Sequence, residues 1–121
     1  MSKISDISKL YFILEKIEDL EEYIAISENI FNLLNNKLSY DASLMCLLQI
    51  GETLNKLVCN YDKLDIDDIK GSYDVRNFIA HDYEGIHKSI IEDIIRYSIP
   101  KLKTSIKFTI EDIELSKKEL I

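Results

Sequence analysis

A single hydrophobic stripe runs through the first third of the chain. Between about Ile4 and Asn35, apolar side chains recur at steps of three and four residues, which is the spacing of one face of an α-helix. The stripe comprises Ile7, Leu10, Leu14, Ile17, Ile24, Phe31 and Leu34. Acidic residues between Glu15 and Glu22 mostly occupy the other faces, which is typical of a solvated surface. The pattern predicts one long helix over about residues 4–35.

A second helix is predicted over about residues 41–60, after a short connection at residues 35–37. Ser39 or Asp41 is suited to cap it, because a side-chain oxygen there can accept hydrogen bonds from free backbone N–H groups. Its apolar side chains spread around more than half of the helix and comprise Leu44, Leu47, Leu48, Ile50, Leu54, Leu57 and Val58. This spread indicates a central, buried element. Gly51 costs the helix about 1 kcal/mol relative to Ala, and close packing against a neighbouring helix would explain that cost.

Three more helices are predicted in the second half of the chain. The third runs from Ile66 to His81 or Asp82, after a loop at residues 60–64, and the fourth covers about residues 86–97. The fourth helix is expected to turn inward Ile90, Ile91, Ile94 and Ile95.

A final helix is predicted to run to about Lys118. Pro100 predicts a break before it, and Ser98 can cap it, since Pro is tolerated in the first turn of a helix. Its inner face comprises Leu102, Ile106, Ile110 and Ile113. Because the connections are short, the chain is expected to fold as an all-α, antiparallel bundle of four or five helices.

Composition favours a helical fold in one domain. A length of 121 residues favours a single domain over residues 1–121. Three Gly and one Pro are too few turn residues for an all-β sandwich. The longest apolar runs are five residues, so no membrane-spanning segment is expected. The first ten residues lack the apolar core of a secretory signal, so the protein is expected in the cytoplasm.

Charge and cysteine content narrow the possible partners. The net charge of -7 argues against a protein that coats nucleic acid, because phosphate binding needs clustered Lys and Arg. The most basic stretch could contact phosphate or form a solvated face of alternating charge, and it comprises Lys88, Arg96, Lys101, Lys103 and Lys107. Cys46 and Cys59 are expected to be reduced and structural. No Cys/His cluster has the spacing of a metal site, so neither a metal nor a cofactor is expected.

The candidate chemistry lies in one short segment. Only two Arg and two His occur in the chain, and one of each falls in Arg76-Asn77-Phe78-Ile79-Ala80-His81-Asp82-Tyr83, an R-x4-H-x-Y pattern. Cleaving RNA without a metal requires proton transfer from a 2′-hydroxyl and to a 5′-oxygen, and His81 is suited to it near neutral pH. Arg76 can stabilise the charge of the phosphorane with its planar guanidinium. Asn77 can hold phosphate or the imidazole, and Tyr83 can donate to phosphate or stack on a base.

One ideal helix would not bring these four groups together. Arg76 and His81 would point about 140° apart around the axis, whereas Asn77 would lie near His81, and Tyr83 would share a face with Arg76. Convergence requires a helix end near His81 or a second copy of the chain facing the first. The alternative is a structural segment with a capping His, a surface Arg–Asp pair and a half-buried Tyr.

The stretch from Leu44 to Tyr83 resembles the HEPN superfamily, and most closely its HepT-like toxin branch. The resemblance rests on Ile50-Gly51-Glu52 in one predicted helix and R-N-x3-H-D-Y in the next. It implies a helical bundle that forms a homodimer, with two motifs in a shared groove. It also implies metal-independent endoribonuclease activity toward RNA. A further implied partner is a minimal nucleotidyltransferase antitoxin, which neutralises the toxin by adenylylating the motif tyrosine.

Residue by residue, the resemblance makes Arg76 and His81 the catalytic pair, Asn77 a supporting polar group and Tyr83 the supporting and AMPylated tyrosine. Family members often have an aromatic residue after this tyrosine, whereas Glu84 stands there in this chain. Further carboxylates near the motif are those of Asp74 and Asp82.

Three functions are compatible with these residues. The first is a HepT-like endoribonuclease toxin. The second is a non-catalytic HEPN module that serves a nucleotidyltransferase as its binding partner. The third is a helical scaffold protein in which the motif has no catalytic role. The nuclease requires Arg76 and His81 to converge on an open groove.

Overall fold

The computed structural model describes residues 2–64 and 88–119, with side chains over residues 5–64 and 88–116. Every regular element in these residues is helical. In chain order the elements are α1 (Ser2–Ser27), α2 (Ile30–Leu34), α3 (Lys37–Asn55), α5 (Lys88–Asp93), the π-helical turn η2 (Ile94–Ser98) and α6 (Ile99–Glu119). The all-α prediction is therefore confirmed. The predicted third helix lies outside the described residues.

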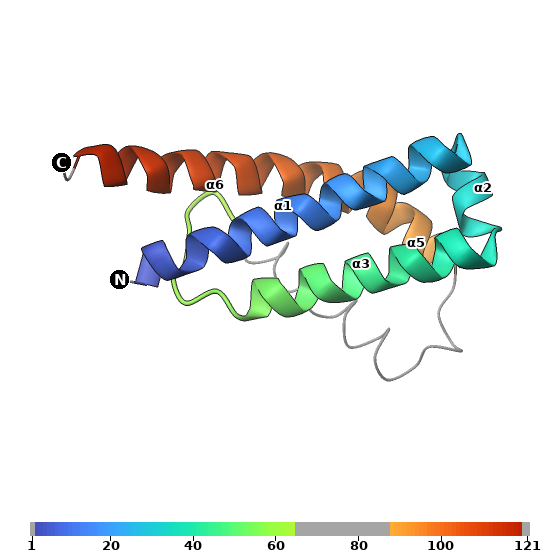
Figure 1. Ribbon diagram of the computed structural model, residues 1–121, viewed down its shortest axis with the longest axis horizontal. Helices are drawn as coiled ribbons and strands as arrows, with labels where there is room; N and C mark the ends of the chain where they lie inside the picture. The colour runs from blue at the N-terminus through green and yellow to red at the C-terminus, as the bar shows by residue number, and fades with distance from the viewer. Residues whose placement is uncertain (1, 65–87, 120–121) are drawn as a thin grey trace.

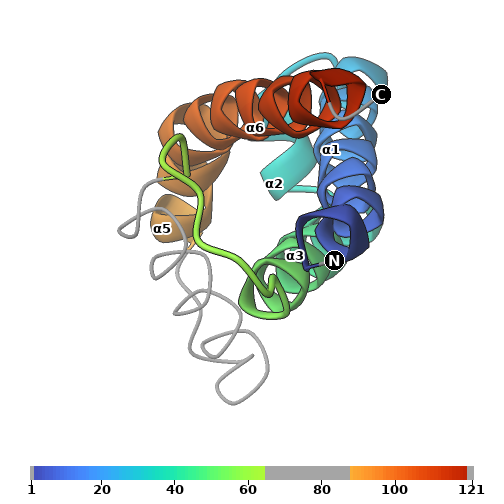
Figure 2. The ribbon, with the colours of Figure 1, turned by 90° about the vertical axis from the view of Figure 1, so that its left-hand side faces the viewer.

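Helix α1 is the central element of the described bundle. It packs against both α3 and α6, and it runs antiparallel to both, so that α1 begins and α6 ends at the same end of the molecule (Figure 1). Viewed from that end, α3 and α6 lie on different sides of α1 (Figure 2). The short helix α2 connects α1 to α3 at the opposite end and also contacts α5.

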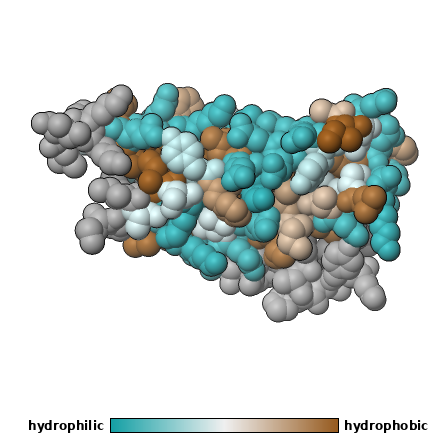
Figure 3. Space-filling view, viewed as in Figure 1, coloured by the Kyte–Doolittle hydropathy of each residue, from teal (hydrophilic) through white to brown (hydrophobic). Residues whose placement is uncertain are grey.

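The core consists mainly of leucine and isoleucine. Its α1 and α3 members are Leu10, Ile13, Ile17, Leu20, Leu44, Leu47, Ile50 and Leu54. The predicted inner face of α6 is confirmed, since Leu102, Ile106, Ile110 and Ile113 are all buried. Gly51 is buried as well, in agreement with the close packing predicted there. On the face shown in Figure 3, hydrophobic side chains form small, separate patches among hydrophilic ones.

The predicted first helix over residues 4–35 is interrupted. Helix α1 ends at Ser27, and Glu28 follows with a φ of 77°, a left-handed conformation that turns the chain. Asn29 then caps α2 by accepting a hydrogen bond of 2.8 Å from the backbone N–H of Asn32. Because this turn resets the helical phase, the stripe continues only in part, with Leu34 buried as expected. Phe31, expected inside, is 69% exposed.

The predicted boundaries and caps of the second helix are also wrong. Asn36 is the cap of α3, and its side-chain oxygen accepts from the backbone N–H groups of Leu38 and Ser39 at 3.0 and 3.2 Å. The helix therefore begins at Lys37, and neither Ser39 nor Asp41 caps it. It ends at Asn55, so Val58 falls in the following loop and is 63% exposed.

The break predicted at Pro100 does not occur. The chain stays helical from α5 through η2 into α6, and Ser98 belongs to η2 instead of capping a new helix. The N–H of Ile99 donates to the carbonyl of Ile94, five residues earlier, which is the wider spacing of a π turn. Pro100 lacks an N–H, and its ring would clash with the carbonyl of residue 96 in a regular α-helix, so the preceding turn widens. Ile90, expected inside, is 46% exposed.

Candidate functional site

The four predicted site residues lie in residues 65–87, here called the motif segment. Arg76, Asn77, His81 and Tyr83 are all outside the described residues, and so are Asp74, Asp82 and Glu84. Their convergence and their roles therefore stay predictions. The structure describes how the chain is held on each side of this segment.

The chain contacts different helices before and after the motif segment. On the C-terminal side, the Lys88 ammonium lies 5.5 Å from the centre of the Tyr40 ring, in the first turns of α3. On the N-terminal side, Leu64 is buried at the end of the loop that follows α3. Just before Leu64, the Lys63 ammonium lies 3.2 Å from Oδ2 of Asp112 in α6.

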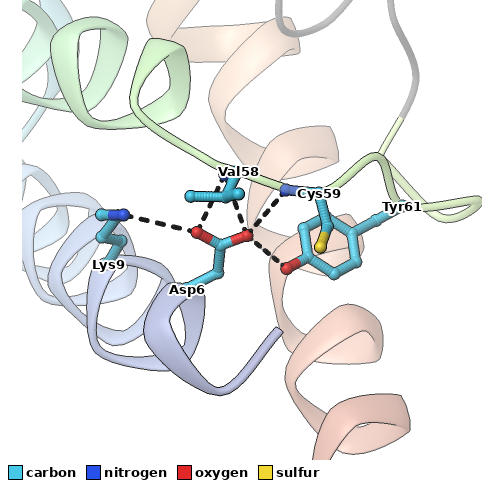
Figure 4. Close-up of polar contacts among 5 residues, drawn as sticks. All are labelled: Asp6, Lys9, Val58, Cys59 and Tyr61. Atoms are coloured by element: carbon cyan, nitrogen blue, oxygen red, sulfur yellow. Dashed lines mark hydrogen bonds and ion pairs between the residues drawn. The ribbon is translucent and has the colours of Figure 1, made fainter. Parts of the chain in front are cut away.

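The loop after α3 is held by the carboxylate of Asp6 in α1. The side chain of Asp6 has no exposed surface. Both of its oxygens accept from the N–H of Val58 at 3.0 Å, and Oδ2 also accepts from the N–H of Cys59 at 3.0 Å and from the Tyr61 hydroxyl at 2.6 Å (Figure 4). Lys9 forms an ion pair of 3.4 Å with Oδ1. We call these five residues the Asp6 cluster.

The two acidic groups of the Asp6 cluster shift in opposite directions. Burial raises the pKa of the Asp6 carboxyl, but the hydrogen bonds from Tyr61, Val58, Cys59 and Lys9 outweigh burial, and the net pKa is lowered. Burial, followed by the hydrogen bond to Asp6, raises the pKa of Tyr61 well above its usual value. Asp6 is therefore a carboxylate and Tyr61 a neutral phenol at neutral pH.

Asp6 is a functional candidate that the hydrophobic pattern did not single out. A signal for it exists in the sequence, because Asp6 continues the buried α1 positions Leu10, Ile13 and Ile17 at steps of four, three and four residues. A carboxylate on a buried stripe requires donors from elsewhere in the fold. Those donors come from residues 52 to 55 positions later in the chain, so the helical pattern could not identify them.

The basic stretch near the C-terminus is paired largely with neighbouring groups. Arg96 Nε lies 2.8 Å from Glu92 Oε2, and Lys103 Nζ lies 2.9 Å from Glu21 Oε1. Lys88 lies over the Tyr40 ring. These contacts favour the interpretation of a solvated face of alternating charge over that of a phosphate-binding surface.

The clefts in the described part of the chain include an apolar one and a polar one. One of about 400 Å³ is mostly apolar and lies where α1 meets η2, with Ile24, Ile95 and Pro100 in its lining. The other, of about 170 Å³, is polar and lies between the loop at residues 60–63 and α6. The described residues contain no group of three or more His, Cys, Asp or Glu side chains placed to hold a metal ion. Among the same residues, no helix is long and apolar enough to cross a membrane.

Comparison with known proteins identifies the family. The model of the family described as "Ribonuclease HepT-like" matches residues 13–108, which is most of the chain. The chain belongs to the HepT-like ribonuclease family. The matched range includes the whole R-x4-H-x-Y motif from Arg76 to Tyr83, and it extends from α1 into α6.

One curated protein adds to this assignment of a HepT-like ribonuclease. It is named "Putative RNase MJ1216", from Methanocaldococcus jannaschii, and it is 28% identical over 109 residues that cover 87% of each chain. No solved structure matches the chain.

Proposed function

We propose that this HepT-like protein is a metal-independent endoribonuclease toxin. The observation that carries the proposal is the match to the ribonuclease family across residues 13–108, with the complete R-x4-H-x-Y motif inside it. The ribonuclease name of the archaeal relative supports the same class of activity.

In this proposal, Arg76 and His81 carry the reaction. An imidazole exchanges protons near neutral pH, so His81 accepts the proton of the 2′-hydroxyl as that oxygen bonds to phosphorus, and a protonated imidazole then gives a proton to the 5′-oxygen as its bond to phosphorus breaks. Arg76 keeps its charge throughout and stabilises the phosphorane through two parallel hydrogen bonds to phosphate oxygens. Asn77 holds the phosphate or the imidazole, and Tyr83 donates to phosphate or stacks on a base.

The proposed active form is a homodimer with two-fold symmetry. Since one ideal helix separates Arg76 from His81 by about 140°, a groove shared by two motif segments supplies the missing convergence. Two-fold dimers are also the commonest closed assemblies. Sedimentation should give a dimer at micromolar concentration, and a monomer at high micromolar concentration would contradict this assembly.

The proposed partner is a minimal nucleotidyltransferase that acts as the antitoxin of a type VII-like toxin–antitoxin pair. It would transfer AMP from ATP to the hydroxyl oxygen of Tyr83 and release pyrophosphate. The added phosphodiester carries a charge of about -1, and on a helix it would lie one heptad from Arg76 on the same face. It would occupy the site that the substrate phosphate needs, so inhibition would require no change of fold.

A pair of histidine variants tests the catalytic proposal. His81→Ala should abolish the cleavage of RNA, while His87→Ala, which alters the other histidine of the chain, should keep most of it. Cleavage of a labelled RNA is followed by gel, and circular dichroism checks that both variants are folded. Equal cleavage by both variants would contradict the proposed role of His81.

A second candidate function is favoured by the acidic surroundings of the motif. Asp74, Asp82 and Glu84 lie within eight residues of Arg76 in the sequence, and carboxylates close to the site would repel RNA phosphates. A non-catalytic HEPN module would still bind the nucleotidyltransferase. Binding to that partner, with no cleavage of any RNA by the wild-type protein, would favour this second function.

A further inference from the structure

The Asp6 cluster contains a charge that the fold has taken completely out of water. Removing a carboxylate from water is costly, so a buried ion is weak evidence of a role in stability alone. Unlike an apolar side chain, a carboxylate fixes the orientation of the groups that it contacts, because its hydrogen bonds require donors at defined angles.

The donors of the Asp6 cluster fix the orientation of the chain after α3. The N–H groups of Val58 and Cys59 are consecutive, so the carboxylate sets the plane of two adjacent peptide groups. The Tyr61 hydroxyl, two residues after Cys59, donates a further hydrogen bond to the same carboxylate. Val58 itself is mostly exposed, so the loop is positioned here by its backbone and not by burial of that side chain.

This oriented loop leads directly to the motif segment. From Tyr61, one hydrogen bond of 3.1 Å links its carbonyl to the N–H of Leu64, which is buried. Residue 65 begins the motif segment, and Arg76 follows twelve residues after Leu64. The chain therefore enters the motif segment from a loop that is held by Asp6 in α1 and, at Lys63, by an ion pair of 3.2 Å with Asp112 in α6.

We propose that Asp6 is a positioning residue for the ribonuclease reaction, which acts by orienting the loop at residues 58–61 and through it the segment that carries Arg76 and His81. This inference rests on the proposed function. Asp6 touches neither substrate nor reacting atoms in this scheme. A displacement of about 1 Å at a reacting group can reduce a rate by as much as about a hundred-fold, so an error in the entering chain is enough to reduce turnover.

The main test compares two Asp→Asn substitutions in the same helix. Asp6→Asn keeps the shape of the side chain but removes its charge, and it replaces one acceptor with an NH2 group that cannot accept from the loop. Asp19→Asn is the matched control, because Asp19 also pairs with a lysine three residues away, Lys16 at 3.3 Å, but has no hydrogen bond to that loop. Asp6→Asn should lower kcat about ten- to a hundred-fold with KM little changed, and Asp19→Asn should keep kcat.

A core variant separates positioning from general loss of stability. Ile13→Val removes one methyl group from a fully buried position of α1. The side chain of Ile13 is apolar and takes no part in the hydrogen bonds of the Asp6 cluster. All assays are run where circular dichroism shows each variant folded. If Ile13→Val lowers kcat as much as Asp6→Asn does, or if Asp6→Asn keeps the kcat of Asp19→Asn, the inference is wrong.

Two further variants keep the test decisive if Asp6→Asn does not fold. Tyr61→Phe removes one donor and leaves the carboxylate, so it should lower kcat in the same direction by a smaller factor. Asp6→Glu keeps the charge and should recover part of the rate that Asp6→Asn loses. Full activity in Tyr61→Phe together with an inactive Asp6→Glu would overturn the inference.

Hydrogen exchange distinguishes failure of this inference from failure of the proposed function. Asp6→Asn should change the amide exchange of peptides covering residues 65–87, and Asp19→Asn should not, whether or not the protein cleaves RNA. Unchanged exchange in Asp6→Asn overturns the positioning role. Wild-type protein without cleavage, or cleavage that survives His81→Ala, overturns the proposed function instead.

Discussion

The hydroxyl of Tyr61 donates a hydrogen bond of 2.6 Å to Oδ2 of Asp6, across 55 positions of the sequence. This bond joins the first turns of α1 to the loop that ends at Leu64, so it holds that loop against the N-terminal end of α1. It also couples the titration of the Asp6 carboxyl to that of the Tyr61 hydroxyl. The bond stabilises the ionised carboxylate and the neutral phenol together, and it therefore lowers one pKa and raises the other.

We predict that Asp6 makes the folded state sensitive to acid. Its folded pKa is lowered, so its contribution to stability is present above the unfolded pKa of about 3.9 and is lost as the pH falls through the folded value. Asp6→Asn should therefore unfold at lower temperature than wild type at pH 7, and the difference should shrink toward pH 3. Thermal unfolding followed by circular dichroism measures this, and a difference independent of pH would contradict it.

For Tyr61, the contribution to stability changes with pH in the opposite direction. The raised pKa of Tyr61 means that its contribution is present below about pH 10, where the unfolded phenol titrates, and is lost above it. Tyr61→Phe should cost about 1.5–3 kcal/mol at pH 7, as expected for a hydrogen bond to a charged group. That cost should decrease above pH 10. Tyr97→Phe is a suitable control, because Tyr97 is largely exposed.

The two cysteines should differ strongly in reactivity. Cys46 is 3% exposed, and burial raises the pKa of its thiol, with the nearby charge of Asp19 acting in the same direction. Cys59 is partly exposed, and neither cysteine forms a disulfide. A thiol reagent should titrate one group rapidly in the native protein and both in denaturant. Cys59→Ala should remove the rapid phase, whereas rapid loss of both thiols in the wild type would show that α3 opens readily.

Arg76→Lys tests whether the reaction needs a guanidinium and not only a positive charge. An ammonium cannot form two parallel hydrogen bonds to a phosphate, so most of the cleavage activity should be lost while the fold is kept. Arg96→Lys is the matched control, since Arg96 pairs with Glu92 on the surface. Wild-type cleavage should persist in EDTA. Activity that stops in EDTA and returns with magnesium would contradict a metal-independent reaction.

Tyr83 is predicted to be the site of adenylylation. Incubation with the partner nucleotidyltransferase and ATP should add the mass of AMP to wild-type protein and stop RNA cleavage, and Tyr83→Phe should escape both effects. Intact-mass spectrometry gives the result directly. An AMP adduct that persists on Tyr83→Phe would move the modification to another residue and remove this role from Tyr83.

The helical character of the chain and its C-terminal core face could be predicted from the sequence. Leu102, Ile106, Ile110 and Ile113 are buried as expected, because one uninterrupted helix keeps its phase from the first of them to the last. The same periodicity predicted the wrong burial for Phe31, because the left-handed Glu28 turns the chain before that residue. It failed at Val58 because α3 ends at Asn55. Periodicity predicts faces within an element and carries no information across a turn.

The sequence by itself determined the helical class and the R-x4-H-x-Y motif, and with them the family to which the chain belongs. The motif is readable because its chemistry depends on residue types at fixed short spacings. Only the tertiary structure decided that Asp6 would be a buried acceptor for residues 58, 59 and 61. That role requires the loop after α3 to bring its hydrogen-bond donors to a carboxylate on α1. Neither the local sequence pattern nor the spacing of a helix predicts a contact between residues so far apart in the chain.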